Sequence, residues 1–217
     1  MRLLRDLFER NAAWAQRTES EDPGFFSRLR VQQTPNFFWI GCSDSRVPAE
    51  QITDLKPGDL FVHRNVANVV AHQDLSCQAA LQFAVDVLKV KHVLVVGHHG
   101  CGGVRAAMQD HELPGPAGEW LQPVRTLYCA QADRFSGWVD AQTRWDKLCE
   151  LNVIEQVSAL CGAAVIQRAW GRRQELAVHG WIYDLRDGRL QDLNVTVTSD
   201  AECPGAVEAA RRRVMIT

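Results

Sequence analysis

The sequence predicts a single α/β domain over residues 1–217, with a mixed, mainly parallel β-sheet core flanked by helices and a helical arm at the N-terminus. Two observations support this prediction. Short, continuously apolar runs, which are typical of strands covered on both faces, recur along the chain. Between them lie segments whose apolar residues are spaced by three and four, as in helices. This alternation of strands and helices indicates βαβ units and a largely parallel sheet.

The N-terminal segment is expected to be a helical arm. Apolar residues recur at helical spacing over residues 1–17, with charged residues between them. The turn-forming Asp22-Pro23-Gly24 separates this helix from the rest of the chain, and the expected arm covers residues 1–30. Such an arm packs either on a partner subunit or on its own domain, and the residues leave both alternatives open. The α/β core, which carries the candidate zinc site, is expected over 34–200, followed by a C-terminal helix over 201–217.

The expected elements of the core follow in order. Asp187-Gly188 is a hairpin signal, so the last strand turns back on the one before it. Asp74 is expected to cap the first helix of the core. Strands are expected at 37–41, 59–64, 92–97, 175–183 and 189–197, and helices at 75–88 and 148–160, with further helices between 120 and 170 after a loop that starts at 112.

Composition and charge exclude several classes of partner. A net charge of −2 favours neither nucleic acid nor an anionic membrane surface. No stretch approaches the ~20 apolar residues that cross a bilayer, and the N-terminus lacks the features of a secretory signal. The seven cysteines are odd in number and irregular in spacing. They therefore indicate free thiols in a reducing cytoplasm, some of them metal ligands.

Cys42, His98 and Cys101 form the candidate metal site. Cys42 follows the first expected strand and His98 follows the strand at 92–97, and α/β sheets bind ligands beyond the carboxyl ends of their strands. Two thiolates and an imidazole are zinc ligands, and three such ligands leave the fourth position of a tetrahedral zinc for water or substrate. We therefore expect one Zn²⁺ per chain that activates a water. The adjacent His99 is expected not to be a ligand.

Three other interpretations of this pattern compete. In the first, the two cysteines are unrelated core thiols, and in the second they are a redox pair. In the third, they bind a purely structural zinc whose permanent fourth ligand is Asp44. Asp44, Arg46 and the glycines nearby fit a hydrophobic core poorly. A redox pair usually has the spacing Cys-x-x-Cys.

Asp44 and Arg46 are expected to gate the metal site. Two thiolates cancel the charge of the metal, so its water is less acidic than in a three-histidine site, where the pKa is ~7. Asp44 on the metal would displace that water, whereas a bidentate pair with Arg46 would hold the carboxylate away. The site is then open only while Asp44 is paired with Arg46.

Three motifs occur in order along the chain: Cys42-x-Asp44-x-Arg46, the segment 59–68 and His98-x-x-Cys101-Gly102-Gly103. Together they resemble the β-class carbonic anhydrases, and Trp39, Arg64 and Tyr183 are similar to the bacterial type that has a non-catalytic, allosteric bicarbonate pocket. The resemblance extends along nearly the whole chain, from Gln33 to Tyr183. It implies the fold of that family, the reversible zinc-dependent hydration of CO₂ to bicarbonate and a proton, and a homodimer or homotetramer.

The resemblance also implies a role for each site residue. Asp44 and Arg46 form the catalytic pair, and Gln33 hydrogen-bonds the substrate oxygen from across a dimer interface. Phe83 stands where the family commonly has tyrosine. The zinc ligands are Cys42, His98 and Cys101, with Asp44 as the competing fourth ligand; the CO₂ pocket is formed by Val66, Phe83, Gly102 and Gly103.

A second, regulatory pocket is implied for Trp39, Arg64 and Tyr183. Bicarbonate bound there would move the segment that carries Asp44, so that Asp44 leaves Arg46 and binds the metal. The competing interpretation is that Trp39 and Tyr183 are sheet-core aromatics and Arg64 is a surface charge.

Two further functions remain as alternatives. One is a carbon disulfide or carbonyl sulfide hydrolase on the same fold. The other is a non-enzymatic, zinc-stabilised bicarbonate sensor in which Asp44 stays on the metal.

Overall fold

The computed structural model describes residues 4–31, 33–44, 46, 48–109, 111, 113–137 and 140–216. The chain divides into two compact units, Met1–Thr34 and Pro35–Thr217. The first unit contains helices α1 (Arg5–Glu21) and α2 (Phe25–Val31), which are joined by a turn with Gly24 at φ +83°. No residue of either helix is buried. The predicted N-terminal helical arm is thus confirmed, with its first helix extending to Glu21.

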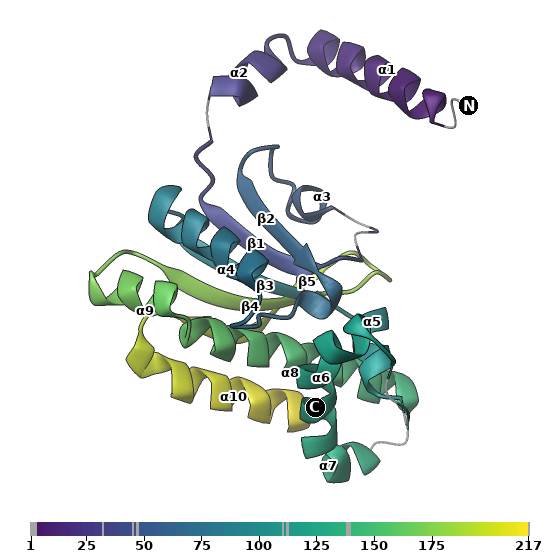
Figure 1. The fold of residues 1–217 in the computed structure, drawn as a ribbon, viewed down its shortest axis with the longest axis vertical. Helices are drawn as coiled ribbons and strands as arrows, with labels where there is room; N and C mark the ends of the chain where they lie inside the picture. The colour runs from purple at the N-terminus through teal and green to yellow at the C-terminus, as the bar shows by residue number, and fades with distance from the viewer. Residues whose placement is uncertain are drawn as a thin grey trace. The chain divides into compact units, whose positions relative to one another are not determined.

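The second unit is built on a five-stranded mixed sheet with the strand order β2-β1-β3-β4-β5 (Figure 1). The pairs β1–β2, β1–β3 and β3–β4 are parallel, and β5 is antiparallel to β4. This sheet confirms the predicted fold class. The strands are β1 (Phe37–Cys42), β2 (Leu60–Asn65), β3 (His92–His98), β4 (Ala177–Tyr183) and β5 (Leu190–Val197).

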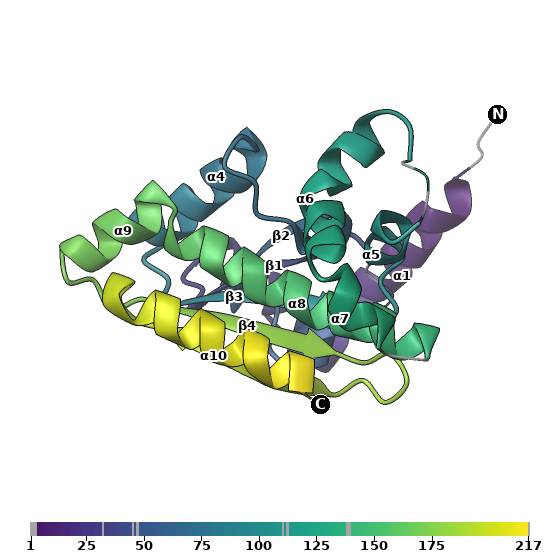
Figure 2. The ribbon, with the colours of Figure 1, turned by 90° about the horizontal axis from the view of Figure 1, so that it is seen from below.

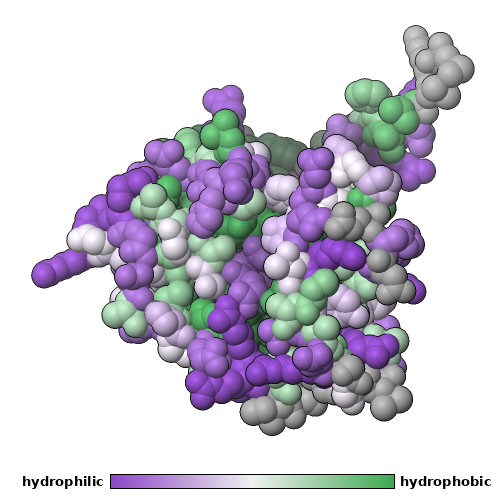
Figure 3. Space-filling model, turned by 60° about the horizontal axis from the view of Figure 1, so that its bottom comes forward, coloured by the Kyte–Doolittle hydropathy of each residue, from purple (hydrophilic) through white to green (hydrophobic). Residues whose placement is uncertain are grey.

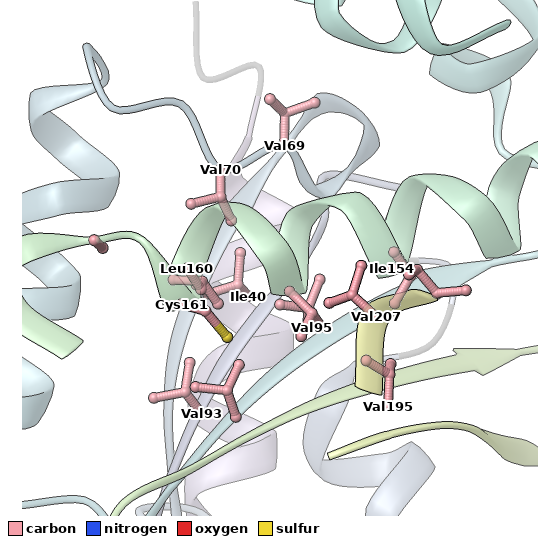
Figure 4. Packing of buried hydrophobic residues seen from close by; sticks show 14 of the residues in the cluster. Ile40, Val69, Val70, Val93, Val95, Ile154, Leu160, Cys161, Val195 and Val207 are labelled. Carbon is pink, nitrogen blue, oxygen red and sulfur yellow. The ribbon is translucent and has the colours of Figure 1, made fainter. Parts of the chain in front are cut away.

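Helices cover one face of the sheet and bury most of the core there. Helix α8 packs along β3 and β4, and α10 packs on β5 and on α8 (Figures 1 and 2). Figure 4 shows Leu160 of α8 in one cluster with Ile40 and Val93 of the sheet. The helices that contribute to this core include α4 (Leu75–Gln82), η2 (Phe83–Val87), α8 (Ala141–Cys161), α9 (Ala164–Gly171) and α10 (Cys203–Ile216).

The other face of the sheet has a smaller cluster, which includes Trp39, Leu94 and Tyr183 together with Ala49 of α3 (Ala49–Thr53). The remaining elements are η1 (Val66–Asn68), α5 (Gly102–Ala107), α6 (Pro116–Ala130), α7 (Ala132–Ser136) and η3 (Asp200–Glu202). Val104 of α5, Leu121 of α6 and Phe135 of α7 also belong to the larger cluster.

Two expected helices differ from the observed ones. The helix expected at 75–88 changes after Gln82 into a wider π-helical turn, η2. The helix expected at 148–160 begins seven residues earlier, at Ala141, because the Asp140 carboxylate caps it by accepting hydrogen bonds from the backbone N–H groups of Gln142 and Thr143. This longer helix brings further polar residues of α8 to the edge of the sheet.

Among the described residues, no single helix has the length and apolarity to cross a membrane; only the pair α8 and α9, bent by 59°, passes that test jointly. Hydrophilic residues are distributed over the face drawn in Figure 3, with apolar residues in small patches between them.

Candidate metal centre

The sheet brings three predicted ligands to one place. Cys42 ends β1, His98 ends β3, and Cys101 immediately precedes α5. Since β1 and β3 are adjacent parallel strands, their carboxyl ends meet at the same edge. The two sulfur atoms and a ring nitrogen of His98 all lie within 4.8 Å of one another, and all three residues are buried.

The donor set fits zinc. Two sulfurs that are each about 2.3 Å from a tetrahedral zinc stand about 3.8 Å apart, and Cys42 Sγ and Cys101 Sγ are separated by 3.7 Å. His98 Nδ1 lies 3.0 Å from the carbonyl oxygen of His99, which can only accept, so Nδ1 carries the proton. His98 Nε2 is buried without a hydrogen-bond partner. Its lone pair is therefore available to a metal.

The two thiols influence each other's acidity. The hydrogen bond from the Cys101 thiol lowers the pKa of Cys42 well below its usual range, and the same contact, together with burial, raises the pKa of Cys101. The backbone N–H of Asp44 also donates to Cys42 Sγ, at 3.4 Å. One thiolate is thus stabilised within the protein itself, and thiolate is the metal-binding form of cysteine.

Asp44 lies between Arg46 and the metal-facing nitrogen of His98. Arg46 donates two hydrogen bonds to the carboxylate, from Nε to Oδ1 at 2.9 Å and from Nη2 to Oδ2 at 2.7 Å. The pair lowers the pKa of Asp44. Oδ2 is also 3.8 Å from His98 Nε2. A short displacement would therefore carry the Asp44 carboxylate away from Arg46 and toward His98 Nε2.

Trp39, Arg64 and Tyr183 lie close to the ligand-bearing segments. Arg64 is half-buried and donates from Nε to the Cys42 carbonyl at 2.7 Å and from Nη2 to the Asp44 carbonyl at 3.1 Å. The Tyr183 ring stacks on His98 with ring centres 5.5 Å apart. Trp39 is buried, and its indole N–H has no hydrogen-bond partner among the described residues.

Comparison with known proteins identifies the family. The structure of a β-carbonic anhydrase from Coccomyxa, in complex with acetazolamide, superposes with a TM-score of 0.86 at 39% identity, covering 92% of this chain and 90% of that one. Residues 37–190 match the protein-family model described as carbonic anhydrase. The chain belongs to the β-class carbonic anhydrase family.

Two further relatives extend this result. A carbonic anhydrase of Emericella nidulans is 43% identical over 189 residues, which are 87% of this chain and 82% of that protein. One of two tetrameric β-carbonic anhydrases from Sordaria macrospora superposes with a TM-score of 0.86 at 36% identity, covering 91% of this chain and all of the other. The similarity to carbonic anhydrases thus extends over most of the chain.

Some of the residues expected to form the carbonic anhydrase substrate pocket lie together. A Cβ atom added to Gly103 would lie 2.8 Å from Val66 Cγ1, so glycine allows these two segments to touch next to Cys101. A Cβ added to Gly102 meets nothing within 4 Å. Phe83 is partly exposed and contacts the ring of Phe61 on β2. Gln33 belongs to the Met1–Thr34 unit, and its role in substrate binding stays a prediction.

Sequence reasoning missed a group of residues that surrounds His99. His99 Nδ1 lies 3.3 Å from Asp184 Oδ2, and Nε2 lies 3.2 Å from Glu150 Oε1. Burial alone would lower the pKa of His99, but the two carboxylates and nearby Asp146 raise it. The ring nitrogens therefore face carboxylates, which agrees with the expectation that His99 is not a ligand. Recognising Asp140 as a helix cap would have placed Asp146 and Glu150 on one helix.

A second donor group, His63, Asp74 and Cys77, also lies within 4.8 Å. Its members have structural roles. Asp74 Oδ1 accepts from Ser76 N at 3.0 Å and caps α4, as predicted. Cys77 is fully buried, which raises its pKa to about 11. The paired thiols and the unpartnered nitrogen that favour metal binding occur only at the first group among the described residues.

Proposed function

We propose that this chain catalyses the zinc-dependent, reversible hydration of CO₂ to bicarbonate and a proton. The observation that carries the proposal is the donor set of Cys42, His98 and Cys101, buried at the ends of adjacent strands beside the Asp44–Arg46 pair. The relative from Emericella nidulans, named a carbonic anhydrase, supports it over most of the chain.

Cys42, His98 and Cys101 would hold one Zn²⁺. When bound, Zn²⁺ acts as a Lewis acid that acidifies a water and so supplies the nucleophile for CO₂. His98 contributes Nε2, whose direction is fixed by the hydrogen bond at Nδ1. Val66 and Gly103, whose segments touch, would form a small apolar pocket for CO₂ beside the ligands together with Phe83 and Gly102. Gln33, supplied across a dimer interface, hydrogen-bonds the substrate oxygen.

Asp44 and Arg46 control access to the metal. While Arg46 holds both carboxylate oxygens, Asp44 can still accept a hydrogen bond from the reacting water and orient its lone pair toward CO₂. When released by Arg46, the Asp44 carboxylate would compete with that water as a ligand of the metal, which would stop turnover. The distance of 3.8 Å between Asp44 Oδ2 and His98 Nε2 supports this exchange, since little movement is required.

Trp39, Arg64 and Tyr183 form a regulatory bicarbonate pocket, which is the feature of the bacterial type. The buried Trp39 N–H is a donor without a protein acceptor among the described residues, and a bicarbonate oxygen would satisfy it. Arg64 also holds the carbonyl of Asp44. Bicarbonate that recruits Arg64 weakens this bond, which frees the Asp44 segment to leave Arg46. The product thereby inhibits the enzyme.

The enzyme works as a homodimer or homotetramer in the cytoplasm. The relatives from Sordaria macrospora are described as tetrameric. The arm of this chain offers apolar side chains to a second copy, among them Phe8 and Val31, whose exposed fractions are 76% and 82%. All seven cysteines are free thiols, which suits a reducing compartment.

A pH series of the CO₂ hydration rate, on protein of known zinc content, tests this function. We expect little activity below about pH 7.5 and a steep rise above about pH 8, because the metal is a weak Lewis acid and Asp44 competes with water. Asp44→Asn should flatten the profile and lower the rate at pH 9. Asp54→Asn is the matched control, since Asp54 is exposed and its left-handed backbone suits asparagine.

Each contrary result points to a different error. A pH–rate profile of the wild type that is flat would contradict gating by Asp44 but not the hydration of CO₂. Protein with one zinc per chain and no hydration at pH 9 would contradict the enzymatic function and favour the sensor. Sulfide release from carbon disulfide in the absence of CO₂ hydration would favour the hydrolase.

A further inference from the structure

We propose that His99 is a positioning residue for the metal centre: its side chain, fixed between Glu150 and Asp184, holds the peptide group that orients His98. The inference rests on the proposed function, in that it takes Cys42, His98 and Cys101 as the zinc ligands. It assigns His99 no contact with metal or substrate.

The first step is the link between His99 and the ligand beside it. His98 Nδ1 donates to the carbonyl oxygen of His99 at 3.0 Å. That carbonyl belongs to the peptide between His99 and Gly100, and Gly100 has a φ of +68°. The orientation of this one peptide plane therefore selects the tautomer and the ring direction of His98. Hydrogen bonds of this kind to ligating histidines tune metal binding.

The second step is the anchoring of the His99 side chain. Its two ring nitrogens lie within hydrogen-bonding distance of carboxylates, Nδ1 3.3 Å from Asp184 Oδ2 and Nε2 3.2 Å from Glu150 Oε1, and the exposed fractions of all three side chains are only 10–13%. The carboxylates are themselves held. Lys147 Nζ contacts Glu150 Oε2 at 3.2 Å, and Arg186 donates to Asp184 from its backbone N–H and from Nε, each at 2.8 Å. The imidazole thus has fixed partners at both ends.

The third step is that helix α8, which carries Glu150, also holds the two residues that follow His99. Gly100 N donates to Asp146 Oδ1 at 3.2 Å, and Trp145 Nε1 donates to the Cys101 carbonyl at 2.9 Å. With Glu150, these are three contacts from α8 to three consecutive residues after His98. The backbone N–H of His99 is bonded on the other side, to the Tyr183 carbonyl at 3.0 Å. Loop and ligands are therefore positioned by α8 and the end of β4.

Zinc affinity, measured by competition with a chromophoric chelator at one fixed pH, tests the proposal. We expect His99→Gln and Glu150→Gln each to weaken Zn²⁺ binding by about 10–100-fold, because the His98 ring loses its fixed direction. The absorption spectrum of the Co²⁺-substituted protein should shift in both variants. Glu150→Gln keeps the histidine and tests the same link if His99→Gln does not fold.

Glu155→Gln is the matched control. Glu155 lies on α8 as well, but both of its carboxylate oxygens accept hydrogen bonds from Arg211 of α10. It should lower thermal stability without changing Zn²⁺ affinity or the Co²⁺ spectrum. Wild-type affinity and spectrum in Glu150→Gln would overturn the inference and leave the proposed function intact. A wild-type protein that binds no Zn²⁺ would overturn both.

Discussion

At the scale of single residues, the metal centre is defined by hydrogen bonds that leave particular atoms free. His98 uses Nδ1 and keeps Nε2 unpartnered. Asp44 uses both oxygens on Arg46 and remains within 3.8 Å of the same Nε2. Trp39 has a buried N–H with no acceptor in the described part of the chain. A buried polar atom without a partner is costly in a folded protein, which is the basis on which we propose a metal at His98 Nε2 and bicarbonate at the Trp39 N–H.

The regulatory pocket is tested by removing one hydrogen-bond donor at a time. Tyr183→Phe and Trp39→Phe should each weaken inhibition by bicarbonate by about tenfold, since one buried hydrogen bond is lost. The measurement is the CO₂ hydration rate at increasing bicarbonate concentration and constant pH. The only other tyrosine, Tyr128, provides the control variant Tyr128→Phe, which should be inhibited like the wild type. Unchanged inhibition in both pocket variants would reject the pocket.

At the scale of elements, close packing of α8 on the sheet depends on small residues in the strands. A Cβ on Gly97 of β3 would lie 2.6 Å from Val153 Cγ2 of α8. A Cβ on Gly180 of β4 would lie 2.5 Å from Val195 Cγ1 and 3.0 Å from Val157 Cγ2. Since α8 also carries the side chains that hold the ligand loop, the depth at which it packs determines the position of that loop.

Gly180→Ala should therefore destabilise the core unit by about 1–3 kcal/mol, the usual cost of overpacking. Denaturant unfolding followed by circular dichroism measures the change. Gly205→Ala is the control: a Cβ there meets nothing within 4 Å, and the residue lies in helix α10, where alanine stabilises by up to about 1 kcal/mol relative to glycine. Equal stability of the two variants would contradict this account of α8 packing.

The same elements show what the sequence could and could not predict. The buried strands β1 and β3 are continuous apolar runs, and their ends carry Cys42 and His98, so both the sheet and the ligand cluster could be anticipated. The partners of His99 could not, because Glu150 and Asp184 come from distant segments that meet only after α8 packs on the sheet.

At the scale of the whole molecule, the two units differ in how they are stabilised. The core unit has its own buried cluster over both faces of the sheet. The arm has no buried residue in α1 or α2, and its contacts include the edge-on pair of Trp14 and Phe26 rings, 5.5 Å apart. Helices with so much exposed apolar surface are stabilised by burying it, either against another chain or against their own domain, and we propose the former.

Deleting residues 1–31 should therefore reduce the assembly without unfolding the core. We expect the truncated protein to retain its melting temperature within a few degrees of the wild type at low concentration but to form smaller assemblies. Light scattering coupled to gel filtration measures the mass. Leu75→Ala serves as the control, since Leu75 is an exposed leucine of the core unit. A truncated protein with the wild-type mass would show that the arm does not mediate assembly.

Helix α8 has two roles, since it forms the centre of the hydrophobic core and its side chains hold residues 99–101. A metal loop of this kind has no low-energy local opening of its own, because releasing it requires moving a helix that the core keeps in place. Release of an ion held by these ligands would then be slowed by the stability of the core. The lifetime of the bound metal would depend in part on how often the domain opens.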